Sequence, residues 1–110
     1  MRKKARSIEF GGNGFVALPE PMTVSVNGDL KTACPKTARV TRLAKVSLIG
    51  VRITNLGLCV LIADPQHPKE NRCALHVKHL QNLDEEDLVE LQRIATEHSV
   101  TALSVGFSSH

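Results

Sequence analysis

The side chains best suited to bind a ligand are basic residues in the first half of the chain. Arg2 and Arg6 stand four residues apart in a basic opening segment, and Arg39, Arg42 and Lys45 follow at three-residue steps. A guanidinium is planar, permanently charged and multidentate, so two of them on one arm can bind a phosphate or lie flat on a purine. The chemistry indicated is recognition of an anion, with a solvated basic tail as the simpler alternative.

Charge is distributed unevenly along the chain. Residues 1–55 carry a net charge of +7 and residues 56–110 a net charge of −4, within a total of +3. An excess of positive charge attracts anions but does not distinguish a nucleotide, a nucleic acid or an acidic protein. The charge pattern therefore favours the first half as the place for an anionic ligand, with ordinary solvated surface as the alternative.

Residues for catalysis or metal binding form no recognisable set. Glycines 11, 12 and 14 lack the following Lys-Ser/Thr pair of a phosphate-binding loop, and no serine or cysteine stands in a known nucleophile motif. Cys73, His76 and His79 are three residues apart, so on a strand His76 points away from the other two and the three cannot converge on a metal ion. We therefore expect no catalytic residue, no metal site, no cofactor and no enzyme activity.

Length and composition favour a single domain over residues 1–110. A chain of 110 residues with 42% hydrophobic content has the size of one common domain. No run reaches the roughly 18 apolar residues that would span a bilayer, so we expect a cytoplasmic protein without membrane insertion. The three cysteines cannot all pair within one chain, and we expect reduced thiols.

Alternating apolar residues and turn signals predict an antiparallel, β-rich α+β domain, either a small barrel or a curled sheet. Asn27-Gly28 is typical of a tight hairpin, because both residues tolerate positive φ. A long β-favouring run follows, in which the inward parity changes after Leu48, and this change predicts a turn or bulge at Gly50. The expected strands are residues 22–26, 30–33, 38–54, 58–63 and 73–80.

An acid-rich segment near the C-terminus predicts the one amphipathic helix. Asp84 suits the N-cap, acids fill the first turn, and an apolar stripe follows that includes Leu88 and Leu91. We expect the helix over residues 84–98 and a last short strand over residues 100–107. Residues 1–7 are expected to form a mobile basic arm, and residues 108–110 a mobile tail.

Two motifs resemble those of the PilZ domain, the bacterial receptor module for cyclic di-GMP. That family has an Arg-x-x-x-Arg arm and an Asp/Asn-x-Ser-x-x-Gly turn on a β-barrel followed by a helix. Arg2 and Arg6 match the arm, and Ser47 and Gly50 match the turn, whereas Lys45 stands where the family has an acid or amide.

The resemblance implies a cytoplasmic signalling module that binds cyclic di-GMP. Arg2 and Arg6 would contact the phosphates and guanine faces of the ligand, while Ser47 and the Gly50 turn would shape the opposite wall beside Lys45. The lysine leaves open a member that binds weakly, or one that docks a protein partner instead.

A second resemblance points to a different class. A sheet followed by an acid-capped helix is also similar to the coat proteins of single-stranded RNA bacteriophages, whose helices lock a dimer. On this alternative Arg39, Arg42, Lys45 and Arg52 would face RNA phosphates, and the protein would be a self-assembling homodimer or larger oligomer.

Overall fold

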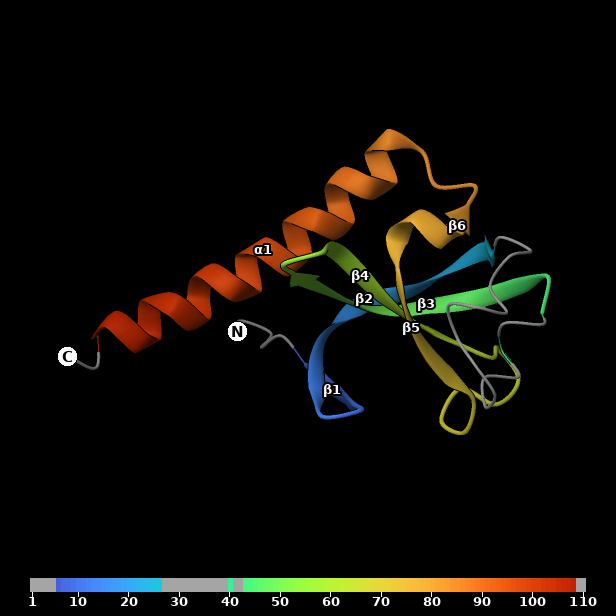
Figure 1. The fold of residues 1–110 in the computed structure, drawn as a ribbon, viewed down its shortest axis with the longest axis horizontal. Coiled ribbons are helices and arrows are strands. Elements are labelled where there is room, and N and C mark those ends of the chain that lie inside the picture. The colour runs from blue at the N-terminus through green and yellow to red at the C-terminus, as the bar shows by residue number, and fades with distance from the viewer. Residues whose placement is uncertain (1–5, 27–39, 41–42, 109–110) are drawn as a thin grey trace.

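A computed structural model describes residues 6–26, 40 and 43–108 of the chain, with side chains described as far as Glu97. Six strands, a short 3₁₀ helix and one long α-helix follow in order (Figure 1). Their bounds are β1 (Ser7–Phe10), β2 (Asn13–Val26), β3 (Lys45–Thr54), β4 (Gly57–Ala63), β5 (Arg72–His76), η2 (Val77–His79), β6 (Leu80–Gln81) and α1 (Glu85–Ser108).

The strands form one antiparallel sheet in the order β1-β2-β3-β4-β5. After β5 the chain passes through η2 and returns to β2, where β6 pairs with Ser25 and Val26. This return connects the β5 side of the sheet to the β2 side and curls the sheet into a partly closed barrel (Figure 1). The predicted fold class, a β-rich α+β domain with one C-terminal helix, is confirmed.

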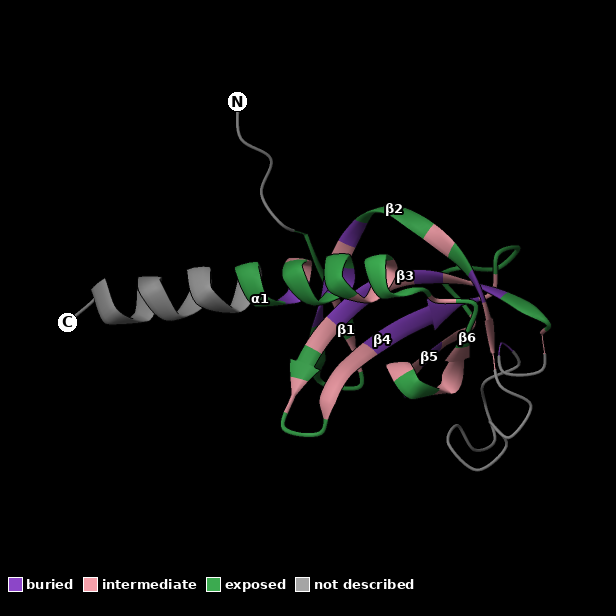
Figure 2. Ribbon diagram, turned by 90° about the horizontal axis from the view of Figure 1, so that it is seen from above, coloured by how far each residue is buried: buried purple, intermediate pink, exposed green. Residues whose placement is uncertain are grey.

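The core lies between the curled sheet and the first half of α1 (Figure 2). Leu91 and Ala95 from the helix are each 1% exposed and pack with buried aliphatic side chains of β2, β3, β4 and β5. The cluster contains Val16, Leu18, Val24, Val40, Val46, Leu48, Val51, Val60, Ile62, Cys73, Leu75, Leu91 and Ala95. Burial of each large aliphatic side chain contributes about 1.5–3 kcal/mol, so this cluster is the main stabilising feature of the fold.

The inward face of β3 changes parity at Ile49. Leu48 pairs with Ile62 and Gly50 pairs with Leu61, so Ile49 is an extra residue without a counterpart on β4. This is a β-bulge, which lets Val46 and Leu48 on one side of it and Val51 on the other all point into the core. The change of face predicted from the sequence at Leu48 to Gly50 is confirmed.

The helix begins where the sequence predicts, and its C-terminal end lies ten residues beyond the predicted end at residue 98. The Asp84 carboxylate accepts a hydrogen bond from the Asp87 N–H at 2.8 Å, as an N-cap residue does. The helical backbone then continues to Ser108, so the expectation of a helix over 84–98 followed by a strand over 100–107 is wrong. The Val and Thr residues of that segment favour strands, but extending a formed helix adds one hydrogen bond per residue fixed, and no proline interrupts it.

Two other expectations about the ends of elements are corrected. Arg6 and Ser7 are not part of a mobile arm, because Ser7 begins β1 and the Arg6 carbonyl accepts a hydrogen bond from the Ala17 N–H at 2.8 Å. Likewise Ser108 ends the helix rather than beginning a tail. Residues 1–5, 109–110 and the predicted hairpin around Asn27-Gly28 lie outside the described residues.

The expected strand over residues 73–80 is divided by a 3₁₀ turn. The Nδ1 atom of His76 accepts a hydrogen bond from the Lys78 N–H at 3.0 Å, which bends the chain out of β5 and into η2. With Nδ1 as the acceptor, Nε2 carries the proton and donates to the Leu56 carbonyl at 2.9 Å. His76 therefore joins the end of β5 to the turn between β3 and β4.

The cysteines are not all reduced. Cys59 is a free thiol, whereas Cys73 is disulfide-bonded, so the expectation of reduced thiols is wrong for Cys73. Three cysteines can form one disulfide and leave one free thiol. Disulfides persist in oxidising surroundings, and the cytoplasmic location stays a prediction.

Within the part of the chain that the structure describes, no helix has the length and apolar character needed to cross a membrane.

Replacing Asp84 with Ala should lower stability by about 1 kcal/mol, because the Asp87 N–H loses its acceptor. Urea unfolding followed by circular dichroism measures this. The control is Asp84→Asn, whose side-chain oxygen can still cap the helix and should keep most of the stability. Equal midpoints for Asp84→Ala and the unmodified protein would contradict the assigned cap.

Replacing Gly57 with Ala should cost more than replacing Gly12 with Ala. Both glycines have positive φ, +117° and +81°, so both substitutions strain the backbone. A Cβ at Gly57 would also lie 2.9 Å from His76 Nε2, whereas nothing lies within 4 Å of one at Gly12. Displacing His76 breaks its hydrogen bonds and should add about 1–3 kcal/mol to the loss. Comparable unfolding free energies for the two variants would refute the role assigned to His76.

Candidate ligand-binding face

The sheet has an outer face, on the side opposite the core, that brings basic and small side chains together. Strand pairing aligns Ala17, Gly50, Leu61 and Ala74 in one row across β2, β3, β4 and β5. Side chains alternate along a strand, so residues two or four positions from this row point to the same face. On β3 the bulged residue Ile49 is left out of that count. We define the outer face by Arg6, Phe15, Ala17, Lys45, Ser47, Gly50, Arg52, Cys59, Leu61, Ala63, Arg72, Ala74 and His76. The centre of this face is closed to solvent, since Gly50, Leu61 and Ala63 are buried, and its basic side chains lie around that centre.

Arg6 lies at the β1 end of the row that contains Gly50. Its carbonyl is hydrogen-bonded to Ala17, and Ala17 is the partner of Gly50 in the next strand. Two strand spacings separate Arg6 from Gly50, about 10 Å between their Cα atoms. The sheet therefore brings one arginine of the predicted arm next to the glycine of the predicted turn.

Ser47 and Gly50 share the outer face only because Ile49 is bulged out. Residues three apart on a regular strand point to opposite faces. Here Ser47 pairs with Ala63 and Gly50 pairs with Leu61, two positions apart on β4 and thus about 7 Å along the sheet. The bulge therefore converts the Ser-x-x-Gly spacing into a serine and a glycine on one surface.

At Gly50, the backbone of β2 and a side chain of β1 pack closely on β3. A Cβ at this position would lie 3.2 Å from Phe15 Cβ, 3.2 Å from the Val16 carbonyl oxygen and 3.4 Å from Ile8 Cδ1. Phe15 and Leu61 are buried, at 4% and 0% exposure, although neither belongs to the core cluster. A second apolar packing on the outer side thus holds β1, with its arginine, against β3.

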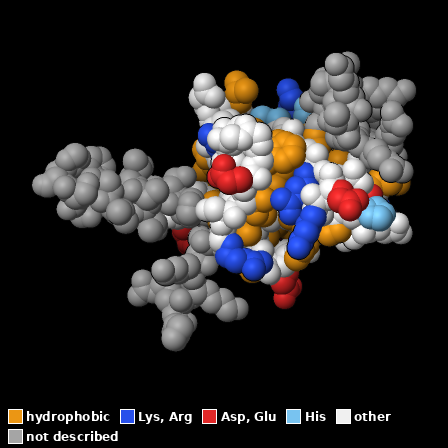
Figure 3. All heavy atoms as spheres, turned by 90° about the horizontal axis from the view of Figure 1, so that it is seen from below, with side chains coloured by type: hydrophobic (Ala, Val, Ile, Leu, Met, Phe, Trp, Pro, Cys, Tyr) orange, Lys and Arg blue, Asp and Glu red, His pale blue; other side chains and the backbone are white. Residues whose placement is uncertain are grey.

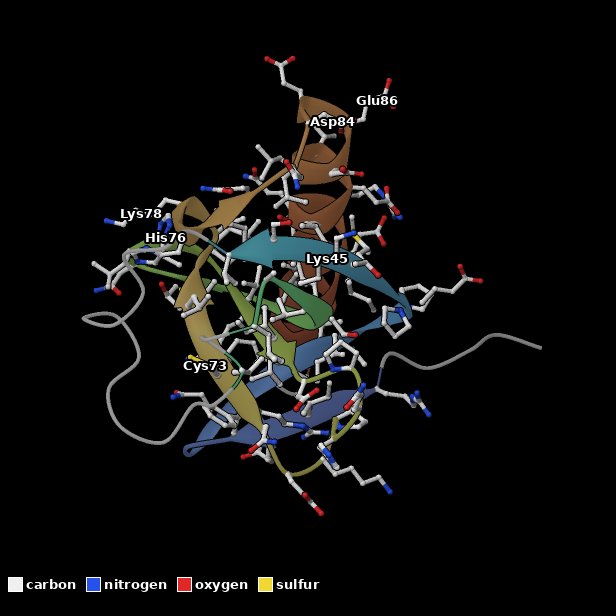
Figure 4. The ribbon with its side chains drawn as sticks, turned by 90° about the vertical axis from the view of Figure 1, so that its right-hand side faces the viewer. Lys45, Cys73, His76, Lys78, Asp84 and Glu86 are labelled. Carbon is white, nitrogen blue, oxygen red and sulfur yellow. The ribbon has the colours of Figure 1, made fainter. Side chains whose placement is uncertain are left out.

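Arg52 and Lys45 lie on the outer face at the two ends of β3. Arg52 pairs with Cys59 and is half-buried, two residues from Gly50. Lys45 is exposed, pairs with Ser25, and lies about 13 Å from Gly50 along the sheet. The structure therefore places Arg6, Ser47 and Arg52 around Gly50. Lys45 lies further along β3, and Figure 4 shows it at a distance from His76 and Lys78.

The cations of the outer face have no counter-ion among the described residues. Arg6, Lys45 and Arg52 make no side-chain hydrogen bond or ion pair with the residues that the structure describes. None of the paired outward positions of β1 to β5 is an Asp or Glu. Lys and Arg side chains gather beside hydrophobic side chains in the view from below (Figure 3).

Arg93 on the helix, in contrast, is paired with carboxylates. Its guanidinium donates to both oxygens of Glu90, at 2.9 and 2.6 Å, and to Glu97 at 2.7 Å. The hydrogen bonds with Arg93 lower the pKa of Glu90, and those with Glu90 and Glu97 raise the pKa of Arg93. An arginine of this protein pairs where carboxylates are in reach, and the outer face offers it none.

One basic residue of this face was not predicted from the sequence. Arg72, at the start of β5, pairs with Ala63 and so lies in the row of Ser47. Its Nε donates to the Pro68 carbonyl at 2.7 Å. No local motif marks it, because only the pairing of β4 with β5 brings it to Ser47.

Other predicted residues lie beyond the described part of the chain, namely Arg2, Arg39 and Arg42. Among the residues the structure describes, no three His, Cys, Asp or Glu side chains are grouped to hold a metal ion. Comparison with protein-family models, with curated proteins and with solved structures finds no match.

Replacing Gly50 with Ala should destabilise the protein by about 1–3 kcal/mol, because the Val16 backbone and Phe15 Cβ must give way. Hydrogen exchange of the amides that join β2 to β3 beside Gly50 should also quicken, because the added Cβ pushes β2 away from β3. The matched control is Gly14→Ala, where the nearest atom is the flexible end of Glu9 at 3.2 Å, and where little loss is expected. Unchanged exchange of those amides in Gly50→Ala would contradict the close packing of β2 on β3 at this point.

Proposed function

We propose that this protein is a non-enzymatic module that binds cyclic di-GMP on its outer face. The observation that carries the proposal is the bulge at Ile49, which puts Ser47 on the same face as Gly50, while strand pairing puts Arg6 in the row of Gly50. These residues come from the two motifs that resemble the PilZ signature, and they are far apart in sequence but on one face of the sheet.

Each group has a role that its chemistry supports. The Arg6 guanidinium can donate two parallel hydrogen bonds to a phosphate or stack on a guanine. The Ser47 hydroxyl can donate to a second oxygen, whereas Gly50 is buried against Phe15 and Ile8 and lets β1 and β2 pack closely beside the ligand. Unpaired cations make this face attractive to an anion, since a ligand phosphate would be their first strong acceptor.

Lys45 alters the expected mode of binding. An ammonium donates hydrogen bonds and accepts none, so it cannot hold the N–H groups of a guanine as a carboxylate would. We therefore expect affinity to come mainly from the phosphates, with strong dependence on ionic strength.

RNA is the second candidate, favoured by the distance between Lys45 and Arg52. Both cations lie on the outer face of β3, about 20 Å apart along the sheet, a span that suits an extended polyanion. A compact ligand at Gly50 would contact Arg52 and leave Lys45 free.

Isothermal titration of nucleic-acid-free protein with cyclic di-GMP tests the proposal. Saturable binding is expected, and Arg6→Ala should weaken it about ten- to a hundredfold, the effect of losing a hydrogen bond to a charged group. The matched control is Lys78→Ala, which removes one exposed positive charge from η2 and should leave affinity unchanged.

The outcomes separate the candidates. Equal affinity of Arg6→Ala and the unmodified protein, or no heat with cyclic di-GMP, would exclude the sensor. Binding of a single-stranded RNA that falls equally with Lys45→Ala and Arg52→Ala would then support the RNA alternative.

A further inference from the structure

The turn between β3 and β4 exposes apolar side chains to solvent. Leu56 in the turn is 78% exposed, and Ile53 near the end of β3 is 40% exposed. With Val89 on α1, they are the exposed large hydrophobic residues among those whose side chains the structure describes. Figure 2 shows the turn as an exposed loop that projects at the start of β4. The apolar patch therefore lies at the apex of a convex hairpin.

The backbone of this turn is held by side chains on both sides of Leu56. Thr54 Oγ1 accepts a hydrogen bond from the Leu56 N–H at 3.1 Å and donates to the Gly57 carbonyl at 3.2 Å. The Leu56 carbonyl accepts a hydrogen bond from His76 Nε2 at 2.9 Å. Both backbone polar groups of Leu56 are thus satisfied inside the protein, as entry into an apolar medium requires. The residue can leave water without leaving either group unpaired.

Positive charge and an absence of acids surround the apex. The 3₁₀ helix η2 lies beside the turn, because the ring of His76 bridges the Leu56 carbonyl and the Lys78 N–H. Lys78 is exposed, and Arg52 lies two residues before the end of β3. None of β3, β4, β5 and η2 contains an Asp or Glu. The hairpin is therefore apolar at its tip and basic beside it, which complements a negatively charged apolar medium.

We propose that this turn docks the protein on the surface of an anionic membrane. The Leu56 side chain enters the boundary between headgroups and acyl chains, and Lys78 contacts the anionic headgroups. A lipid surface suits a convex tip, whereas a stable protein interface buries about 800 Å² per partner, more than two apolar side chains provide. The contact is peripheral and involves no spanning segment. It goes beyond the proposed function, since cyclic di-GMP takes no part in it.

Vesicle flotation measures this contact. The protein should bind vesicles of phosphatidylcholine mixed with phosphatidylserine, and Lys78→Ala should weaken that binding about fivefold. Leu56→Gln should weaken it about ten- to a hundredfold, because burial of the leucine is lost. The matched control is Val89→Gln, which removes a comparably exposed apolar side chain from α1 and should leave binding unchanged. Vesicles of phosphatidylcholine alone should bind more weakly and show no effect of Lys78→Ala.

A single tryptophan reports whether the turn enters the lipid. The chain contains no tryptophan, so Leu56→Trp introduces one fluorophore at the apex. Its emission should shift to shorter wavelength with the mixed vesicles and should be quenched by brominated acyl chains. Val89→Trp should show neither change. Thermal unfolding of each variant establishes that the fold is retained, as expected for two exposed positions.

The contrary outcomes are distinct from one another. Full binding of Leu56→Gln would reduce the contact to electrostatic adsorption, and equal losses for Leu56→Gln and Val89→Gln would assign it to apolar exposure in general. Either result overturns the docking turn, as does a protein that ignores the mixed vesicles. Binding of poly-glutamate by such a protein would indicate an acidic protein partner instead. The titration with cyclic di-GMP tests Arg6 in solution and is independent of all these results.

Discussion

The one-residue bulge at Ile49 is the constraint on which both the core and the candidate site depend. Without it, Val51 would leave the core if Leu48 stayed, and Gly50 would turn away from Ser47. The same extra residue therefore preserves apolar burial on the inner side and assembles the polar surface on the outer side. Core packing thus stabilises the bulge and fixes the side-chain arrangement of the outer face.

Local chemistry was sufficient to predict the features that depend on neighbouring residues. The parity change after Leu48 and the cap at Asp84 both follow from side-chain alternation or from a single hydrogen bond, and both are confirmed. Arg6 and Ser47 were also identified as candidates from their motifs. Their alignment on one face could not be predicted, because it depends on which strands pair and in which register.

The wrong or missing expectations have two different causes. The segment over residues 100–107 has β-favouring residues, but its state is decided by the helix that directly precedes it, which is a local effect. At His76, the ring accepts from Lys78 and also bonds the Leu56 carbonyl, twenty residues earlier in the chain, and this second contact is distant in sequence. Arg72 was missed because its place in the row of Ser47 depends on two strand pairs.

On the proposed function, the cations of the outer face link anion binding to stability. Arg52 is half-buried without a carboxylate partner among the described residues, whereas Lys45 lies about 20 Å away along the sheet, where solvent screens its charge. An anion bound at Arg52 would offset its desolvation, and any ligand that binds only the folded chain stabilises it by RT ln(1 + [L]/Kd). Arg93 is neutralised by two carboxylates of its own helix, whereas Arg6, Lys45 and Arg52 have no carboxylate partner among the described residues.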